Sequence, residues 1–174
     1  MLLFSMMLLG TTFAFAQPEE ASKSREFPAA DVKALDGSIV SSRDFDNDGK
    51  PMVVSFWATW CKPCILELQT ILDEYEDWQD ETGVKLIAVS IDDARNAAKV
   101  QPFVNGKDWP YEVYIDSNQD LKRALQVNNV PATFLLNGKK EIVYQHNSYQ
   151  PGDEEELFDH IVETAEADAE ASGE

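Results

Sequence analysis

The chain has 174 residues, and its 32 acidic residues against 14 basic ones give a formal charge of −18. This length suits one compact domain, and a hydrophobic content of 44% is typical of a globular protein. The charge argues against a nucleic-acid-binding protein, because phosphates are held by Lys and Arg, and against docking on an anionic membrane surface. Two cysteines cannot build a disulfide-rich scaffold or a four-cysteine zinc site. The function therefore has to explain one pair of thiols.

The first sixteen residues form an apolar segment without a charged side chain. They are fewer than the ~20 that a membrane-spanning helix needs. Ala14-Phe15-Ala16 before Gln17 is typical of a signal-peptidase site, so we expect an export signal over 1–16, cleaved after Ala16. The basic start of such a signal is missing, since no Lys or Arg precedes Lys23; a buried helix is the alternative. We expect a periplasmic or otherwise extracytoplasmic mature protein, not stably inserted in a membrane.

After a polar leader over 17–26, strand patterns alternate with helix patterns. Residues 31–35 and 38–41 flank Asp36-Gly37 and predict a hairpin. The apolar run 52–57 predicts a central strand covered on both faces. Apolar residues then recur with steps of 4, 3, 4 and 3, which predicts a helix; they are Cys61, Ile65, Leu68, Leu72 and Tyr75. Gly83 is the expected C-terminal cap of this helix.

The second half of the chain continues this alternation. We expect strands over 84–91, 111–115, 133–136 and 141–145, the last two joined by Asn137-Gly138, and helices over 95–105, 120–126 and 153–165. These patterns predict an α/β fold with a mixed central sheet and helices on both faces.

The C-terminal segment carries most of the negative charge. Residues 153–174 hold ten acidic residues and no Lys or Arg. Four of them, Asp153 to Glu156, lie in the predicted first helical turn, where they complement the helix dipole. We interpret 166–174 as a solvated acidic tail.

The chemistry is concentrated in Trp60-Cys61-Lys62-Pro63-Cys64, at a predicted strand-to-helix junction. A helix N-terminus stabilises a thiolate, so Cys61 is the expected nucleophile. Cys64 follows one turn later and can resolve a mixed disulfide, and Pro63 suits the first helical turn. The pair is therefore interpreted as redox-active.

Two other interpretations of the cysteine pair are weaker. A zinc site would need His146 and His160, which lack metal-site spacing, so we expect no metal. A purely structural disulfide would close too short a loop to stabilise much. Nothing in the sequence suggests a bound organic cofactor.

The run from Trp57 to Cys64, together with Val130-Pro131-Ala132-Thr133, resembles the thioredoxin superfamily, and most closely its exported TlpA/ResA-type thiol–disulfide oxidoreductases. The resemblance spans 27–165 and implies a thioredoxin-like three-layer domain. The hairpin near residue 31 would be that group's N-terminal addition, and 92–116 its central helix-and-strand insertion.

The resemblance also implies roles for individual residues. Pro131 would be cis and lie beside Cys61, with the Val130 backbone and Trp60 contacting substrate. Ser55 stands where thioredoxin has a titrating Asp. The TlpA/ResA-type proteins instead place a Glu three residues after the second cysteine, which is Glu67 here, so we expect it to be the base for Cys64; an ordinary surface Glu is the alternative.

Several remaining side chains have structural interpretations. Lys62 between the cysteines could favour the thiolate or simply be solvated. Trp57, Trp78 and Trp109 are expected to pack in the core, and both histidines to lie at the surface.

The expected reaction is reduction of disulfides in protein substrates. No His lies between the cysteines, which favours a reductant over a strong oxidant. A reductant outside the cytoplasm needs electrons, and the resemblance implies a membrane thiol donor of the DsbD/CcdA type. A disulfide oxidase or isomerase is the alternative enzyme, and a redox-inactive thioredoxin-like binding module or chaperone is the alternative of another class.

Overall fold

The computed structural model describes residues 25–173. The predicted export signal and residues 17–24 of the predicted leader lie outside this range. Within it, one sheet runs in the order β1-β8-β7-β4-β5-β6-β2-β3. Its strands are β1 (Arg25–Glu26), β2 (Asp31–Ala34), β3 (Ile39–Ser41), β4 (Met52–Trp57), β5 (Lys85–Ser90), β6 (Glu112–Ile115), β7 (Ala132–Leu136) and β8 (Glu141–Asn147).

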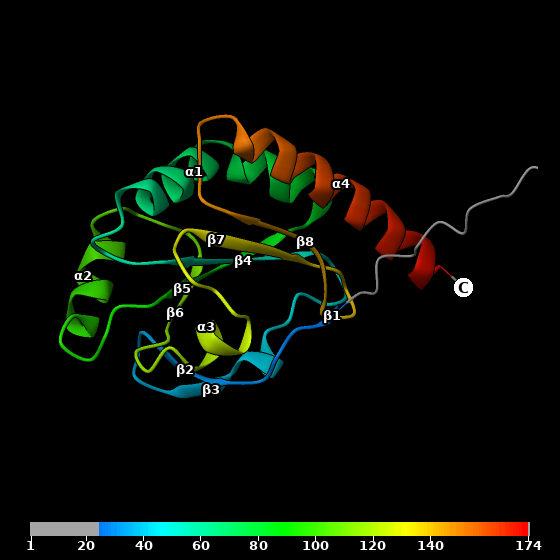
Figure 1. Ribbon diagram of the computed structural model, residues 1–174. Coiled ribbons are helices and arrows are strands. Elements are labelled where there is room, and N and C mark those ends of the chain that lie inside the picture. The colour runs from blue at the N-terminus through cyan, green and yellow to red at the C-terminus, as the bar shows by residue number, and fades with distance from the viewer. Residues whose placement is uncertain (1–24, 174) are drawn as a thin grey trace, which may run out of the picture.

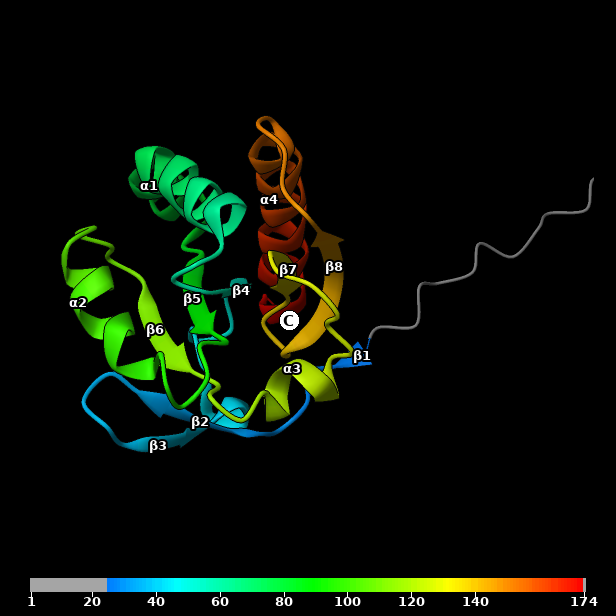
Figure 2. The same cartoon turned by 60° about the vertical axis from the view of Figure 1, so that its left-hand side comes forward.

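The sheet is mixed, as the sequence predicts. Strands β4, β5 and β6 run parallel, while β7 pairs antiparallel with both β4 and β8. The predicted hairpin β2–β3 extends the sheet beyond β6, and β1 closes the opposite edge against β8 (Figure 2). The parallel order brings the carboxyl ends of β4 and β5 to one edge, where α/β proteins place their sites.

Helices cover both faces of the sheet (Figure 1). They are α1 (Lys62–Thr82), α2 (Val100–Asn105), α3 (Asp120–Ala124) and α4 (Asp153–Ser172), with short 3₁₀ turns η1 (Ser42–Asp44) and η2 (Ala97–Lys99). Helices α1 and α4 lie side by side on one face, where Trp78 stacks on Phe158, and α3 lies on the other face beside β2. This is the predicted three-layer arrangement.

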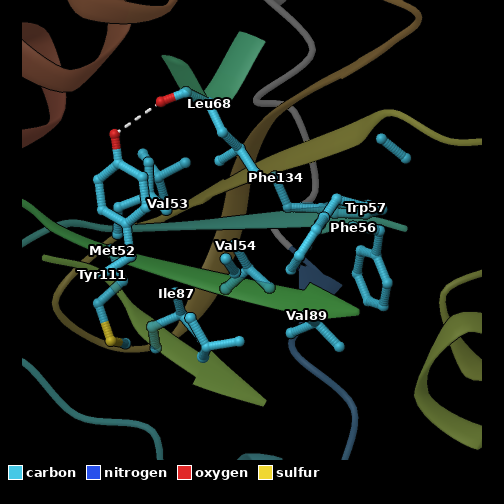
Figure 3. Close-up of a cluster of buried hydrophobic side chains, with 14 of the residues drawn as sticks. Met52, Val53, Val54, Phe56, Trp57, Leu68, Ile87, Val89, Tyr111 and Phe134 are labelled. Atoms are coloured by element: carbon cyan, nitrogen blue, oxygen red, sulfur yellow. Dashed lines mark hydrogen bonds between the residues drawn. The ribbon is translucent and has the colours of Figure 1, made fainter. Parts of the chain in front are cut away.

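Buried side chains lie on both faces of the central strands, and Leu68 of α1 packs on one of these faces (Figure 3). All six residues of β4 are buried, which confirms the prediction of a central strand. Trp57 is fully buried and contacts the rings of Phe103 and Trp109, at 5.6 and 5.0 Å between centroids, which seats α2 against the sheet. Each such buried large side chain contributes about 1.5–3 kcal/mol.

Most predicted boundaries agree with the structure to within a few residues. Helix α1 ends at Gly83, whose positive φ of 67° forms the predicted cap. The helix predicted over 95–105 is divided into η2 and α2, because Arg95 and Asn96 lie in a turn built on the Asp93 side chain.

Two predictions at the chain ends need correction. Arg25 and Glu26, placed in the leader, form β1 and pair with β8. Helix α4 continues to Ser172 instead of ending at 165, so most of the predicted tail is helical. Alanine-rich sequence favours helix there, and the Asp168 carboxylate accepts a hydrogen bond from the Gly138 N–H at 2.7 Å, which ties the end of α4 to the β7–β8 turn.

None of the helices in the described residues is long and apolar enough to span a membrane.

Candidate active site

The two cysteines form a disulfide at the start of α1, with their Cα atoms 5.3 Å apart. Cys61 is the N-cap residue of the helix, and Cys64 lies in its first turn. The Cys64 backbone N–H donates to the Cys61 sulfur at 3.3 Å. A sulfur at this position therefore receives both an N–H group and the positive end of the helix dipole, which stabilise a thiolate once the disulfide opens.

The two sulfurs differ in access. Cys61 is 5% exposed, whereas Cys64 is fully buried. Lys62 and Pro63 are exposed at the first two helical positions, where the missing N–H of a proline leaves no helical bond unmade. Trp60 is 61% exposed immediately before Cys61. An approaching substrate therefore meets Cys61 and Trp60 before Cys64.

The loop before β7 lies beside the disulfide. The Val130–Pro131 peptide bond is cis, which confirms the expectation for Pro131. The Val130 carbonyl oxygen lies 3.7 Å from the Cys61 sulfur. Val130 and Pro131 are thus brought to Cys61 from almost seventy residues away in the sequence.

A buried carboxylate holds the loop that leads into Cys61. Asp92 is fully buried just beyond the carboxyl end of β5. It accepts hydrogen bonds from the Thr59 N–H at 2.8 Å, the Thr59 hydroxyl at 2.7 Å and the Ser90 hydroxyl at 2.8 Å. Sequence reasoning missed this residue, although an Asp directly after a buried strand that neighbours the cysteine loop is a usable signal.

Glu67 is buried on α1, one helical turn after Cys64. It is 1% exposed, which excludes the alternative of an ordinary surface Glu. One of its oxygens, Oε1, accepts a hydrogen bond from the Thr133 hydroxyl at 2.7 Å. The Thr133 hydroxyl oxygen also lies 3.3 Å from the Ser55 hydroxyl, so Ser55, at the position of the Asp in thioredoxin, is linked to Glu67 through one side chain.

His146 corrects our expectation of a surface histidine. Its side chain is only 15% exposed, and its Nε2 lies 3.1 Å from Glu67 Oε1. The sequence could have indicated that His146 is partly buried. One face of β8 carries every second residue, and the less exposed residues on that face are Ile142, Tyr144 and His146. His160 is more exposed and lies near glutamates on α4.

Burial shifts several titrating groups around this site. Desolvation raises the pKa of Tyr149 to about 12, and the hydroxyl of Tyr149 donates to Glu154 at 2.7 Å. Desolvation also raises the pKa of Tyr111, whose hydroxyl donates to the Leu68 carbonyl oxygen at 2.9 Å (Figure 3). These tyrosines stay neutral at physiological pH and contribute hydrogen bonds, not charge.

Comparison with known proteins agrees with this geometry. The family model described as the AhpC/TSA family matches residues 24–145. The chain belongs to the AhpC/TSA family. Within this family it is a thiol–disulfide oxidoreductase of the ResA type, as the cysteine pair indicates and the following relatives show.

Two curated relatives carry names that state this activity. The chain is 32% identical to thiol-disulfide oxidoreductase ResA of Bacillus anthracis over 131 residues, 75% of this chain and 73% of that protein. It is also 32% identical to sporulation thiol-disulfide oxidoreductase A of Bacillus subtilis (strain 168) over 142 residues, 79% of this chain and 82% of that protein.

Solved structures confirm the thioredoxin-like fold. An uncharacterized thioredoxin-like protein from Porphyromonas gingivalis has a TM-score of 0.73 and 48% identity, covering 82% of this chain and 94% of that one. The crystal structure of StoA from Bacillus subtilis has a TM-score of 0.60 and 23% identity, covering 76% and 97%. The latter likeness concerns the fold alone.

Proposed function

We propose that this AhpC/TSA-family oxidoreductase works outside the cytoplasm as a reductant of protein disulfides. The observation that carries the exchange chemistry is the position of Cys61, 5% exposed at the N-cap of α1, with its partner Cys64 fully buried one turn later. The first sulfur can attack a substrate, and the second can act only from inside the protein. This asymmetry suits a nucleophile and a resolving thiol.

The proposed reaction has two exchanges. The Cys61 thiolate attacks a substrate disulfide, forms a Cys61–substrate disulfide and expels a substrate thiolate, which takes a proton from water. Cys64 then loses its proton and attacks the Cys61 sulfur, and the second substrate thiolate leaves. The substrate disulfide is reduced to two thiols, and the Cys61–Cys64 dithiol is oxidised to the disulfide that the structure contains.

Glu67 is the proposed base for Cys64. It lies three residues after Cys64 on the same helix, a spacing that puts the two side chains on neighbouring turns of one face. Both side chains are buried, so a carboxylate there can take the thiol proton where water cannot easily reach.

A Glu67→Gln variant tests this role. We expect slower resolution and a shifted Cys64 titration, since the amide cannot accept a proton. Glu74→Gln is the matched control, because Glu74 lies on the exposed side of α1. Kinetics of Glu67→Gln that match those of the control from pH 6 to 9 would remove Glu67 from the mechanism.

The substrate would bind over Trp60, Val130 and Pro131. Trp60 offers an exposed apolar ring, and the Val130 carbonyl faces the nucleophile at 3.7 Å. An extended substrate segment could pair with this backbone while its disulfide meets Cys61. Lys62 adds a positive charge beside the attacking sulfur, of modest effect because its side chain is exposed.

Compartment and direction rest on the sequence and on the family resemblance. The apolar segment 1–16 supports export, and mass spectrometry of the mature N-terminus tests it. The absence of a His between the cysteines favours reduction. Electrons would then come from a membrane thiol donor of the DsbD/CcdA type.

Trapping tests the assignment of nucleophile and resolving thiol. Reduced Cys64→Ser protein, mixed with insulin, should accumulate a disulfide with an insulin chain, because nothing resolves it. Cys61→Ser should accumulate none, and wild type should release reduced insulin chains. Accumulation on the Cys61→Ser variant would reverse the two roles, and no exchange by wild type would refute the proposed function.

A further inference from the structure

The carboxylate of Glu67 is hydrogen-bonded on one side only. Its Oε1 receives the Thr133 hydroxyl at 2.7 Å and faces His146 Nε2 at 3.1 Å. Its Oε2 is buried and has no hydrogen-bond partner among residues 25–173. A buried carboxylate oxygen without a donor is unfavourable, and this oxygen can still accept a hydrogen bond.

The oxidised state explains why that partner is missing. With the disulfide closed, neither cysteine carries a proton. In the dithiol form Cys64, one helical turn before Glu67, regains an S–H group that can donate. Oε2 is then the atom left for Cys64, because Oε1 is already engaged by two other elements of the fold.

We propose that His146 is a positioning residue for the exchange reaction: from β8 it holds Glu67 Oε1 in its charged form, so that Oε2 is free to take the Cys64 proton. The inference rests on the proposed function and extends it to a residue outside the cysteine motif. A carboxylate can only accept hydrogen bonds, so the tautomer with a proton on Nε2 fits this contact.

The fold fixes this contact from three elements. Thr133 on β7 and His146 on β8 lie directly opposite each other in the sheet register, and both reach the same oxygen of Glu67 on α1. The His146 side chain is 15% exposed and that of Glu67 is 1% exposed, so little water competes for the carboxylate. A hydrogen bond to a charged group in such surroundings is stronger than a neutral one.

His146 therefore acts on one step only. During resolution the Cys64 S–H bond breaks and the proton passes to Glu67 Oε2. The Cys64 sulfur forms its bond to Cys61, and the Cys61–substrate bond breaks with its electron pair on the substrate sulfur. His146 exchanges no electrons and forms no bond; it keeps Glu67 charged before the transfer.

The tyrosines that surround the pair stay neutral between pH 5 and 8. Burial raises the pKa of the tyrosines around the pair, and Glu154 and Glu156 bond to Tyr149 and Tyr144 instead of Glu67. Tyr111 and Tyr149 interact with Glu67, and the Tyr144 ring contacts His146. The charged or titratable groups behind these tyrosines are Glu154 on Tyr149, and Glu156 and His160 on Tyr144.

The test is the pH–rate profile of resolution. The Cys61–substrate mixed disulfide is formed with a chromogenic aromatic thiol, and release of the thiol is followed from pH 5 to 9. His146→Leu removes the donor, so the charged carboxylate is less favoured. We expect the acidic limb to move up by about one pH unit, with rates up to about tenfold lower on that limb and converging near pH 9.

Three further variants make the result specific. His146→Gln restores a donor that does not titrate and should return the limb most of the way to wild type. His160→Leu alters the other histidine, which does not contact Glu67, and should leave the profile unchanged. In a Glu67→Gln background, His146→Leu should have no further effect, because the residue through which it acts is gone.

Two outcomes overturn the proposal. One is a His146→Leu profile that superimposes on wild type while Glu67→Gln loses its acidic limb. Glu67 would then remain the base, and His146 would have no positioning role. The other is an equal rate loss at every pH in both His146 variants, which would indicate a structural role. Failure of the proposed function is distinct, since wild-type protein would then release no thiol at any pH.

Discussion

Replacing Asp92 with Ala tests how the active-site loop is held. The carboxylate receives three hydrogen bonds, two from Thr59 and one from Ser90. A hydrogen bond to a charged group is worth about 1.5–3 kcal/mol, but the variant also removes the desolvation of Asp92, and the half-buried Thr59 can regain some water. We therefore expect the free energy of unfolding to fall by about 3 kcal/mol.

The assay is urea denaturation of the oxidised protein, followed by intrinsic fluorescence. Thr59 lies two residues before Cys61, so the variant should also slow insulin reduction. Asp80→Ala is the matched control and should change neither quantity, because Asp80 is exposed near the far end of α1. A loss below about 1 kcal/mol for Asp92→Ala, together with an unchanged exchange rate, would refute the anchoring role.

Three other substitutions test separate parts of the structure. Gly138→Ala should lower the free energy of unfolding by about 3 kcal/mol or more, because its Cβ would lie 2.0 Å from the Gly49 carbonyl oxygen, whereas Gly173→Ala should be nearly neutral in urea melts. Trp60→Ala should change stability by less than about 0.5 kcal/mol, since the ring is exposed, but weaken insulin binding; an unchanged KM would contradict the substrate role. Burial raises the pKa of Asp168 in the folded protein above its ordinary value of 3.8. The folded state is therefore favoured while this carboxyl is protonated, and that stability is lost as the pH rises from below 3.8 through the raised pKa. Asp168→Asn should then gain stability relative to wild type across that window, and parallel stability curves from pH 3 to 7 would contradict this.

The cysteine site was largely predictable because its signals are local. The apolar run of β4 marks the end of a strand, and Pro63 with the helical stripe marks the start of a helix. Together they place Cys61 at a strand-to-helix junction. Backbone hydrogen bonding and the helix dipole then favour Cys61 as the proposed nucleophile without any tertiary information. The cis bond at Pro131 came from the family resemblance, since the dipeptide alone favours trans.

The support around the site was less predictable because it depends on tertiary pairing. Asp92 meets Thr59 only because β4 and β5 run parallel and end together. His146 meets Glu67 only through the register of β7 against β8, and no motif marks it in the sequence. The length of α4 was misjudged because the charge of the segment was weighed above the helix propensity of its alanines.

The reduction potential of the Cys61–Cys64 pair tests the central claim most directly. The protein is equilibrated with defined dithiothreitol and glutathione buffers, its free thiols are trapped, and the reduced fraction is counted by mass. A disulfide reductant should give a value near that of thioredoxin, about −270 mV. A value near that of DsbA, about −120 mV, would contradict the proposed direction and make the protein an oxidant of its substrates.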